Sequence, residues 1–323
     1  MLRLRFLLAT ALLSTCSAAS AFDGLFVFGD SLSDRGNLAL VIGSDPGQVI
    51  SGNTYIPSRP YASGQFTNGN VWVQSFASAI GLAGFGLPSL AGGGDFAFGG
   101  ARVAADGAGL PPSLSAQESL FLSATGGVAP SGALYVVAGG GNDARDVFAA
   151  ALASATPNVV IAAAAATYAQ DTGVLVDRLQ AAGAQRIVVW DVPDIGLAPA
   201  LAAFGPSASF LGSAIASAMN SALALRLSTE GSLVSTFDLY GLQDSIAANP
   251  GAYGLANVTD ACGAPSNGCN PSTSLFWDGI HPTTAGHAII ASAMVAAVPE
   301  PSEITLVLGG LALIAMKARR RSR

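Results

Sequence analysis

The sequence contains little charge, and most of that charge has one sign. Only 11% of its 323 residues are Asp, Glu, Lys or Arg, whereas 51% are hydrophobic. Residues 22–297, here called the body, contain no lysine, seven arginines and eighteen acidic residues, which gives a formal charge of −11. A body this acidic argues against nucleic-acid binding through phosphate contacts and against attraction to anionic lipid surfaces.

Cysteine and histidine are also scarce. The chain has three cysteines, and the body has two histidines, His281 and His287. Cys262 and Cys269 lie in the Gly- and Pro-containing stretch CGAPSNGC. In an exported protein, which the N-terminus predicts, such a pair indicates a local disulfide. The absence of a further cysteine or a suitable histidine pattern nearby argues against a zinc site.

The first 21 residues are typical of a secretory signal peptide. Arg3 and Arg5 precede the apolar run FLLATALL, and small residues ending in AASA follow. This order predicts export, with cleavage by signal peptidase after Ala21. Cys16 would leave with the peptide, and a lipoprotein signal at this cysteine fits poorly because Thr15 is large for its position. A buried first helix is the alternative interpretation.

Residues 298–323 form a second segment with a processing pattern. A Val-Pro-Glu-Pro motif is followed by the apolar run 304–316 and then by five basic residues. Thirteen helical residues span roughly 20 Å, less than the roughly 30 Å hydrocarbon core of a bilayer, although arginines could snorkel. The segment resembles the PEP-CTERM sorting tail of Gram-negative bacteria. That resemblance implies transient membrane anchoring, processing by an exosortase, and delivery to the cell surface or extracellular matrix; a plain membrane anchor is the alternative.

Short apolar runs in the body predict buried strands. Their nearly continuous apolar character is typical of a parallel sheet that is covered on both faces. The runs lie at 24–28, 133–139, 186–192 and 233–239, with a shorter, glycine-flanked fifth run at 94–100.

Helical patterns alternate with these strands. They start at Val71 and near Thr283, and they cover about 158–182 and 207–227. Pro157 stands at a helix start and Gly183 at a helix end, as expected for these residue types. The alternation predicts one α/β domain over the body: a doubly wound, three-layer α/β/α sandwich with a mostly parallel, five-stranded sheet.

Residues that could carry chemistry follow the strand ends. Ser31 lies in FGDSLSDRGN, Gly100 ends the second block within DFAFGGA, and Asn142 lies in GGGNDARD. Asp278 and His281 open the late block DGIHPTTAGH. Because sites in doubly wound sheets form at the carboxyl ends of strands, we expect these residues to meet at one edge of the sheet.

These residue types suit nucleophilic catalysis. A serine hydroxyl must lose its proton to a base, and histidine is the side chain whose ordinary pKa suits that task near neutral pH. A carboxylate orients the imidazole and stabilises its protonated form. Backbone amides beside glycine, together with an asparagine side chain, stabilise negative charge on an attacked carbonyl oxygen.

Each residue also has a plainer interpretation when taken alone. Ser31 could cap a helix, Gly100 and Asn142 could be turn residues, and His281 could be an ordinary loop residue. His287, on the last predicted helix, is expected to be structural. The joint pattern of the four blocks, which occur in order with the first three at the ends of predicted strands, favours the catalytic interpretation.

The four blocks resemble those of the GDSL family of esterases and lipases, also called SGNH hydrolases. The resemblance implies a flavodoxin-like fold and a serine hydrolase that acts on ester bonds without a metal or a cofactor. It places Ser31, Asp278 and His281 in a catalytic triad. It places an oxyanion hole at Ser31, Gly100 and Asn142.

The sequence departs from the family pattern at one position. The second block usually opens with Asn, whereas this chain has Asp95, an extra carboxylate that could perturb local hydrogen bonding. The chain also lacks G-x-S-x-G, which argues against the sharp nucleophile elbow of α/β-hydrolases and for a looser turn. Insertions at 40–65 and 100–130 are long enough to shape the pocket as lids.

We therefore expect a secreted esterase or lipase that hydrolyses carboxylic esters through an acyl-serine intermediate. Its substrate could be a lipid, a small ester or an acylated polysaccharide, and the sorting tail favours acyl groups on matrix sugars. One alternative is a non-catalytic surface or matrix protein on a hydrolase scaffold. A phosphate-binding enzyme is disfavoured because the GGGND glycines lack the lysine and the spacing of a P-loop.

Overall fold

The computed structural model describes residues 22–107 and 109–298. Residues Phe22–Ala297 form one compact unit, which corresponds to the body. The predicted signal peptide and, apart from its first residue, the predicted sorting tail lie outside the described residues. The fold below is that of the body.

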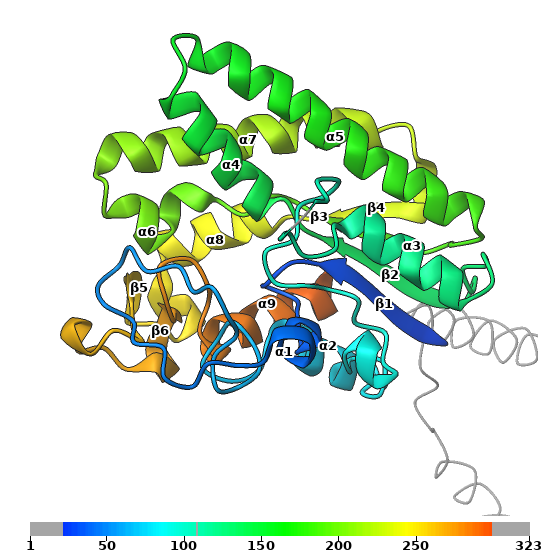
Figure 1. Ribbon diagram of the computed structural model, residues 1–323, viewed down its shortest axis with the longest axis horizontal. Coiled ribbons are helices and arrows are strands. Elements are labelled where there is room, and N and C mark those ends of the chain that lie inside the picture. The colour runs from blue at the N-terminus through cyan, green and yellow to red at the C-terminus, as the bar shows by residue number, and fades with distance from the viewer. Residues whose placement is uncertain (1–21, 108, 299–323) are drawn as a thin grey trace, which may run out of the picture. The chain divides into compact units, whose positions relative to one another are not determined.

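A parallel sheet of four strands lies at the centre of the body, in the order β1-β2-β3-β4 (Figure 1). Each strand coincides with a predicted apolar run, and its first and last residues lie within two positions of the ends of that run. Strands β2 and β3 are buried along their whole length, as expected for strands covered on both faces. The strands are β1 (Gly24–Gly29), β2 (Ala133–Ala138), β3 (Ile187–Trp190) and β4 (Val234–Phe237).

The prediction of a fifth, shorter strand at 94–100 is wrong, because the central sheet has four strands. The segment lies along the outer edge of β1, where Val27 N–H donates to Gly94 O (2.9 Å) and Phe96 N–H donates to Val27 O (2.8 Å). It forms only two isolated bridges at Asp95, one with Val27 and one with Pro88, and the backbone of Asp95 exchanges hydrogen bonds with residues 87–89 on its other side.

The position of this segment nevertheless defines the winding of the chain. The chain leaves β1, passes along its outer edge at 94–98, and then crosses to β2 on the other side of β1. After β1 the chain runs to one side, and after segment 94–98 it runs to the other side. The two directions diverge at the carboxyl ends of β1 and β2. This is the point at which doubly wound sheets form ligand crevices.

Helices cover both faces of the sheet and complete the predicted three-layer sandwich (Figure 1). On one face, α5 and α7 pack against each other and against α4. On the other face, α2 packs against α9. The predicted helices correspond to α2 (Trp72–Ala79), α5 (Pro157–Ala181), α7 (Pro206–Leu227) and α9 (Thr284–Ala297).

Other helices have weaker sequence signals and were not predicted. Two of them, α3 and α4, pack against α5, and α3 starts where the Ser113 hydroxyl accepts the N–H of Ala116 (3.1 Å). Thus part of the predicted 100–130 insertion is a helix. These elements are α1 (Asn37–Ile42), α3 (Leu114–Ala124), α4 (Gly141–Leu152), α6 (Pro199–Ala202) and α8 (Leu239–Ala248).

Helices α5 and α7 are long and apolar enough to cross a membrane by length and composition. Their inward faces contribute Tyr168, Leu175 and Leu223 to the hydrophobic core over the sheet. Both therefore serve as core helices of the body.

A second, two-stranded parallel sheet pairs β5 (Asn257–Ala261) with β6 (Ser274–Phe276). It was not predicted, because both strands are short and β5 is largely polar. Between them, the side chains of Cys262 and Cys269 are in contact, with their Cα atoms 5.4 Å apart. Strand β6 leads directly into the DGIHP loop and so determines where that loop lies.

Candidate active site

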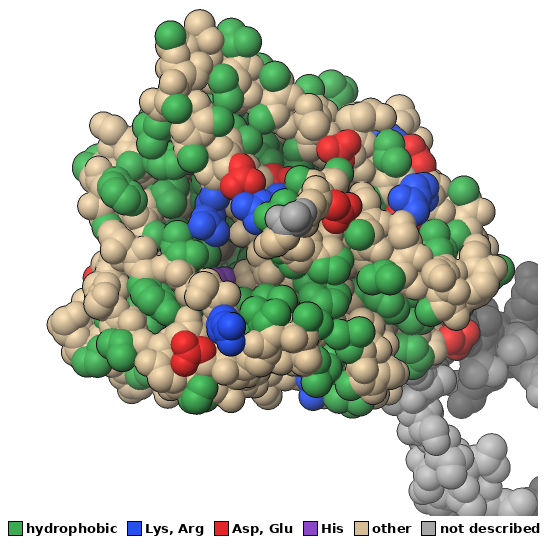
Figure 2. Space-filling model, in the orientation of Figure 1, with side chains coloured by type: hydrophobic (Ala, Val, Ile, Leu, Met, Phe, Trp, Pro, Cys, Tyr) green, Lys and Arg blue, Asp and Glu red, His purple; other side chains and the backbone are tan. Residues whose placement is uncertain are grey.

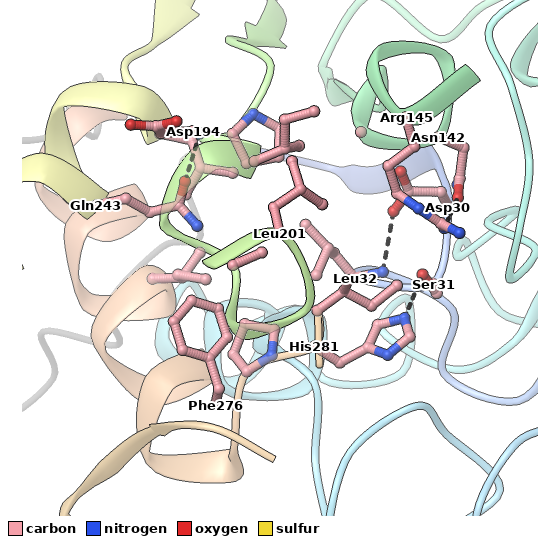
Figure 3. Close-up of a pocket in the computed structure, with 18 residues that line it drawn as sticks. Asp30, Ser31, Leu32, Asn142, Arg145, Asp194, Leu201, Gln243, Phe276 and His281 are labelled. Carbon is pink, nitrogen blue, oxygen red and sulfur yellow. Dashed lines mark hydrogen bonds between the residues drawn. The ribbon is translucent and has the colours of Figure 1, made fainter. Parts of the chain in front are cut away.

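Ser31, His281 and Asp278 form a continuous chain of hydrogen bonds. The Nε2 atom of His281 lies 2.8 Å from Ser31 Oγ, and its Nδ1 atom lies 2.7 Å from Asp278 Oδ2. The exposed fractions are 8% for Ser31, 3% for His281 and 0% for Asp278. Figure 3 shows Ser31 facing His281, with Asn142 and Arg145 nearby. The five residues predicted at the sheet edge thus lie around one site.

Ser31 lies on a tight turn directly after β1. The carbonyl oxygen of Asp30 accepts the N–H groups of Ser33 (3.0 Å) and Asp34 (2.9 Å), which folds the chain back at this point. No helix starts at Ser31; α1 begins at Asn37, after Gly36. The helix-cap interpretation of Ser31 is therefore wrong, and its side chain is available for the bond to His281.

The Asp278 carboxylate accepts four hydrogen bonds. Oδ1 accepts the backbone N–H groups of Ile280 and His281, both at 2.8 Å. Oδ2 accepts the Tyr61 hydroxyl at 2.9 Å and faces Nδ1 of His281. An ionised carboxylate is an acceptor only, so this set suits the charged form and holds it in one orientation.

Potential oxyanion donors lie beside Ser31. Gly100 has a φ of +85°, a conformation that favours glycine, and Asn142 is the second residue of α4. The backbone N–H groups of Ser31 and Gly100 have no acceptor among the described residues. Ser31, Gly100 and Asn142 line one pocket, where they could stabilise a negatively charged oxygen.

Two hydrogen bonds orient the amide of Asn142. Its Nδ2 atom donates to Ala101 O (3.0 Å), and its Oδ1 atom accepts from Nη1 of Arg145 (3.2 Å). The second Nδ2 proton has no partner among the described residues. The amide therefore presents a donor at the site.

Two cavities meet at Ser31. One holds about 620 Å³ of empty space, partly open to solvent, and has mainly apolar walls with Asp194 and Gln243 among them. The other holds about 370 Å³ and is lined partly by residues 56–58 and Phe66. Figure 2 shows a histidine at the bottom of a hollow with basic side chains around it. An ester bound across Ser31 could place one side of its scissile bond in each cavity.

Burial raises the pKa of several carboxyl groups close to the site. The pKa of Asp30 rises to about 6, although the N–H of Leu32 donates to its Oδ1 atom (3.0 Å). Burial likewise raises the pKa of Asp34 and of Asp143 to about 6. These carboxyl groups therefore change charge near pH 6, close to the site.

Asp95 is fully buried, and its carboxylate accepts hydrogen bonds from backbone N–H groups. Its Oδ2 atom accepts the N–H of Arg35 (2.8 Å), and its Oδ1 atom accepts the N–H of Ala97 (3.1 Å). Burial, and then the nearby Asp34, raise its pKa well above the ordinary value. The aspartate thus gives each of the two amides its own acceptor oxygen, whereas an asparagine would have one acceptor oxygen for both.

His287 lies buried on α9, at 1% exposure. Its two ring nitrogens have no hydrogen-bond partner among the described residues, and burial lowers its pKa to about 3. It lines neither cavity at Ser31. Over the described residues there is also no group of three His, Cys, Asp or Glu that could hold a metal ion.

Several residues that shape the site were missed from the sequence. Tyr61 bonds to Asp278, Phe66 stacks on His281 with ring centroids 5.2 Å apart, and Arg145 bonds to Asn142. Their residue types are common and carry no local signal of these contacts. Asp34, which accepts the N–H of Gly99 (2.8 Å), could have been suspected because it shares a block with Ser31.

Known proteins resemble this chain over most of its length. A model of the GDSL-like lipase/acylhydrolase family matches residues 25–294. Esterase EstA of Pseudomonas aeruginosa is 30% identical over 354 residues, which cover 93% of this chain and 51% of that protein. Esterase EstA of Pseudomonas putida has the same values, so this chain spans about half the length of these two relatives.

Two further proteins illustrate how far the similarity extends. A GDSL esterase/lipase of Arabidopsis thaliana is 26% identical over 327 residues, which cover 85% of this chain and 87% of that protein. The crystal structure of phospholipase A1 from Streptomyces albidoflavus covers 86% of this chain with a TM-score of 0.41 and 17% identity. Structural likeness at this level is low, so membership rests on the family model. Because that model spans nearly the whole body, the chain belongs to the GDSL-like lipase/acylhydrolase family.

Proposed function

We propose that this protein is a serine esterase that hydrolyses carboxylic esters through an acyl-serine intermediate. The observation that carries the proposal is the hydrogen-bonded chain from Asp278 through His281 to Ser31, beside unpaired N–H donors. Membership of an esterase and lipase family supports the same reaction class.

In the first half of the reaction, Ser31 Oγ attacks the ester carbonyl while Nε2 of His281 takes its proton. The Asp278 carboxylate, which faces Nδ1, stabilises the imidazolium that forms. The N–H groups of Ser31 and Gly100 and the Nδ2 donor of Asn142 hold the tetrahedral oxyanion. The C–O bond to the alcohol then breaks, and His281 returns the proton to the leaving alkoxide.

In the second half, water attacks the acyl-serine carbonyl. His281 takes one proton from the water, the same donors hold the second oxyanion, and the bond between the acyl group and Ser31 Oγ breaks. The proton passes back to Ser31, and the carboxylic acid leaves. The steps use side chains and backbone amides of this chain together with water.

The sharpest test replaces the attacking oxygen. Ser31→Ala is expected to reduce hydrolysis of p-nitrophenyl esters by at least about 10³-fold, because the remaining donors still bind the ester but nothing attacks it. A fluorophosphonate probe should label the wild type and not the variant. Ser245→Ala, on an exposed position of α8, is the matched control and should keep full activity and labelling. Undiminished hydrolysis by Ser31→Ala would falsify the mechanism, and absence of labelling in the wild type would favour a non-catalytic matrix protein.

We further propose that the substrate is an acylated sugar of the extracellular matrix. The proposal rests on the sorting-tail pattern of residues 298–323, which would deliver the enzyme to that matrix. A series of p-nitrophenyl esters of increasing acyl length tests it. Highest kcat/KM on acetate supports this substrate class, whereas preference for acyl chains of eight carbons or more supports a lipid substrate instead.

Export and processing are part of the same proposal. We expect signal peptidase to cleave after Ala21, exosortase to remove the tail, and Cys262 and Cys269 to form a disulfide outside the cytoplasm. The contact between the two cysteine side chains supports that disulfide. Intact-mass analysis of the protein recovered from the matrix, with and without reductant, measures all three. A mass that retains residues 1–21 would contradict export.

A further inference from the structure

The segment 55–67, from the insertion before α2, lies along the loop that carries Asp278 and His281. Tyr61 donates its hydroxyl hydrogen bond to Asp278, and the Phe66 ring stacks on the imidazole of His281 at an interplanar angle of 29°. The Tyr55 carbonyl accepts the N–H of Gly279 (3.1 Å), and Thr67 Oγ1 donates to Pro282 O (2.9 Å). Four of the five loop positions 278–282 are therefore contacted by one segment, which forms a fixed wall of the site in this structure.

Within this segment, we propose that Tyr61 is a positioning residue that controls how strongly Asp278 binds His281. Its hydroxyl lies 2.9 Å from Oδ2 of Asp278, the same oxygen that lies 2.7 Å from Nδ1 of His281. The proposal rests on the proposed esterase function, since it gives Tyr61 a role in the same triad.

The shared oxygen gives this contact its effect. Oδ1 of Asp278 is occupied by two backbone N–H groups, so the negative charge directed at His281 resides chiefly on Oδ2. A hydroxyl that donates to Oδ2 withdraws part of that charge and competes with the imidazole for it.

Tyr61 is suited to remain a donor over the working pH range. It is 7% exposed, and burial, followed by the charge of Asp278, raises its pKa above the ordinary tyrosine value. The hydroxyl therefore keeps its proton at neutral and mildly alkaline pH. It supports Asp278 without adding a second negative charge.

Removal of the Tyr61 hydroxyl should shift the pH–rate profile in one direction. Oδ2 would carry more negative charge toward Nδ1, which favours the protonated imidazole, so the acidic limb of the pH–rate profile moves to higher pH. Other titratable or charged groups also interact with this pair from neighbouring elements. They are Asp30 on the turn after β1, Arg145 on α4, His287 on α9 and Tyr55 on the same segment.

The experiment compares Tyr61→Phe with Tyr55→Phe. Both variants lose one hydroxyl from the same segment, but the Tyr55 hydroxyl donates to Gln48 Oε1 (2.7 Å) and does not touch the triad. Tyr61→Phe is expected to move the acidic limb of the pH–rate profile upward by several tenths of a pH unit, with little change in KM. Tyr55→Phe should match the wild type in both respects, because burial raises the pKa of the Tyr55 hydroxyl and so keeps it uncharged, and because the backbone carbonyl that accepts the N–H of Gly279 is unchanged. Since Asp30 and the other three groups are the same in the wild type and in Tyr61→Phe, their contributions cancel in the comparison.

A spectroscopic measurement keeps the proposal separate from the esterase activity. In the Ser31→Ala background, where no turnover is needed, the proton between Nδ1 of His281 and Asp278 gives a downfield NMR resonance at low temperature. Tyr61→Phe should move this resonance further downfield, because the competing donor is gone. Absence of esterase activity in the wild type would contradict the proposed function while leaving this result interpretable.

Two outcomes overturn the role of Tyr61. One is a Tyr61→Phe enzyme whose pH profile and NMR resonance coincide with those of the wild type. The other is a loss of thermal stability alone, equal in both variants, which would make Tyr61 structural. If Tyr61→Phe fails to fold, 3,5-difluorotyrosine at position 61 keeps the ring and strengthens the donor, so the acidic limb should move to lower pH; no shift would contradict the proposal.

Discussion

At the scale of single residues, the orientation of one amide is decisive. Asn142 can offer an N–H to an oxyanion only when its Nδ2 atom, rather than its Oδ1 atom, faces the site. The bonds to Ala101 O and from Arg145 fix both ends of the amide and select that orientation. Arg145 has no carboxylate within ion-pair distance among the described residues, so its bond to Asn142 is its main side-chain contact there.

Replacing Asn142 should therefore lower kcat rather than weaken substrate binding. Asn142→Ala is expected to lower kcat by about 10²–10³-fold with a small change in KM, the usual cost of one oxyanion donor. Steady-state kinetics on a p-nitrophenyl ester measures both values. A change confined to KM would mean that Asn142 contacts the substrate only in its ground state.

Replacing Arg145 should also lower kcat, but by a smaller factor than replacing Asn142. Arg145→Met keeps the length of the side chain but frees Oδ1 of Asn142, so kcat should fall on the order of 10-fold. Arg186→Met is the control, because Arg186 is exposed and its side chain bonds only to Gln185 O. Equal activity of the two variants would show that Asn142 keeps its orientation without Arg145.

At the scale of elements, the start of α4 places Asn142 at the site. Gly140 precedes the helix with a φ of +106°, and a Cβ at this position would lie 2.8 Å from the Tyr168 ring of α5. The left-handed conformation and the close approach of α5 both require glycine here. The N-terminal end of α4 also directs its partial positive charge toward the pocket.

Gly140→Ala is expected to cost stability and rate together. The strained φ alone costs about 1–2 kcal/mol, and the contact with Tyr168 adds to it and shifts α4 with Asn142. Gly205→Ala, before α7, is the matched control: its φ is +93°, but a Cβ there meets nothing within 4 Å. Chemical denaturation and kcat should show a larger stability loss for Gly140→Ala, and a loss of kcat for that variant only. Equal effects would mean that the α5 contact is unimportant.

At the scale of the whole body, the buried acids affect the pH dependence of stability more than the buried histidine does. Burial raises the pKa of Asp30, Asp34 and Asp143 to about 6 and that of Glu118, on α3, to about 7. Each then stabilises the fold below its unfolded pKa, and that contribution is lost as the pH rises through 6–7. His287 acts in the opposite direction, because its folded pKa of about 3 makes the fold lose stability as the pH falls below about 6.5.

The net expectation is a fold that is more stable in mild acid than in mild base. The melting temperature should be higher at pH 5.5 than at pH 8, as four acids outweigh one histidine in that interval. Glu118→Gln should stabilise the protein at pH 8 by on the order of 1 kcal/mol, after discounting for the exposed Arg178 beside it, and by less at pH 5.5. A higher melting temperature at pH 8 than at pH 5.5 in the wild type would contradict this account.

The sequence by itself determined the parts of the protein that depend on local pattern. Continuous apolar runs predicted β1 to β4 because burial on both faces of a parallel sheet demands them. Ser31 and Asn142 were predicted because each follows a predicted strand, and strand ends meet at one edge. His281 was predicted because it lies in the last of the ordered blocks. The segment 94–100 was expected to be a fifth, shorter strand, since its composition does not reveal the competing bonds of Asp95.

Only the tertiary structure decided which side chains support those residues. Tyr61 and Asp278 are 217 positions apart, and Asn142 depends on a carbonyl 41 positions away. Such contacts arise where the chain folds back on itself, and a tyrosine or an arginine in a loop or helix carries no local mark of a distant partner. The small β5-β6 sheet likewise holds the DGIHP loop. Its pairing could not be predicted from the sequence, because its strands are short and β5 is largely polar. The proposed nucleophile and base could thus be predicted from the sequence, whereas the groups that orient them are set by long-range packing and hydrogen bonding.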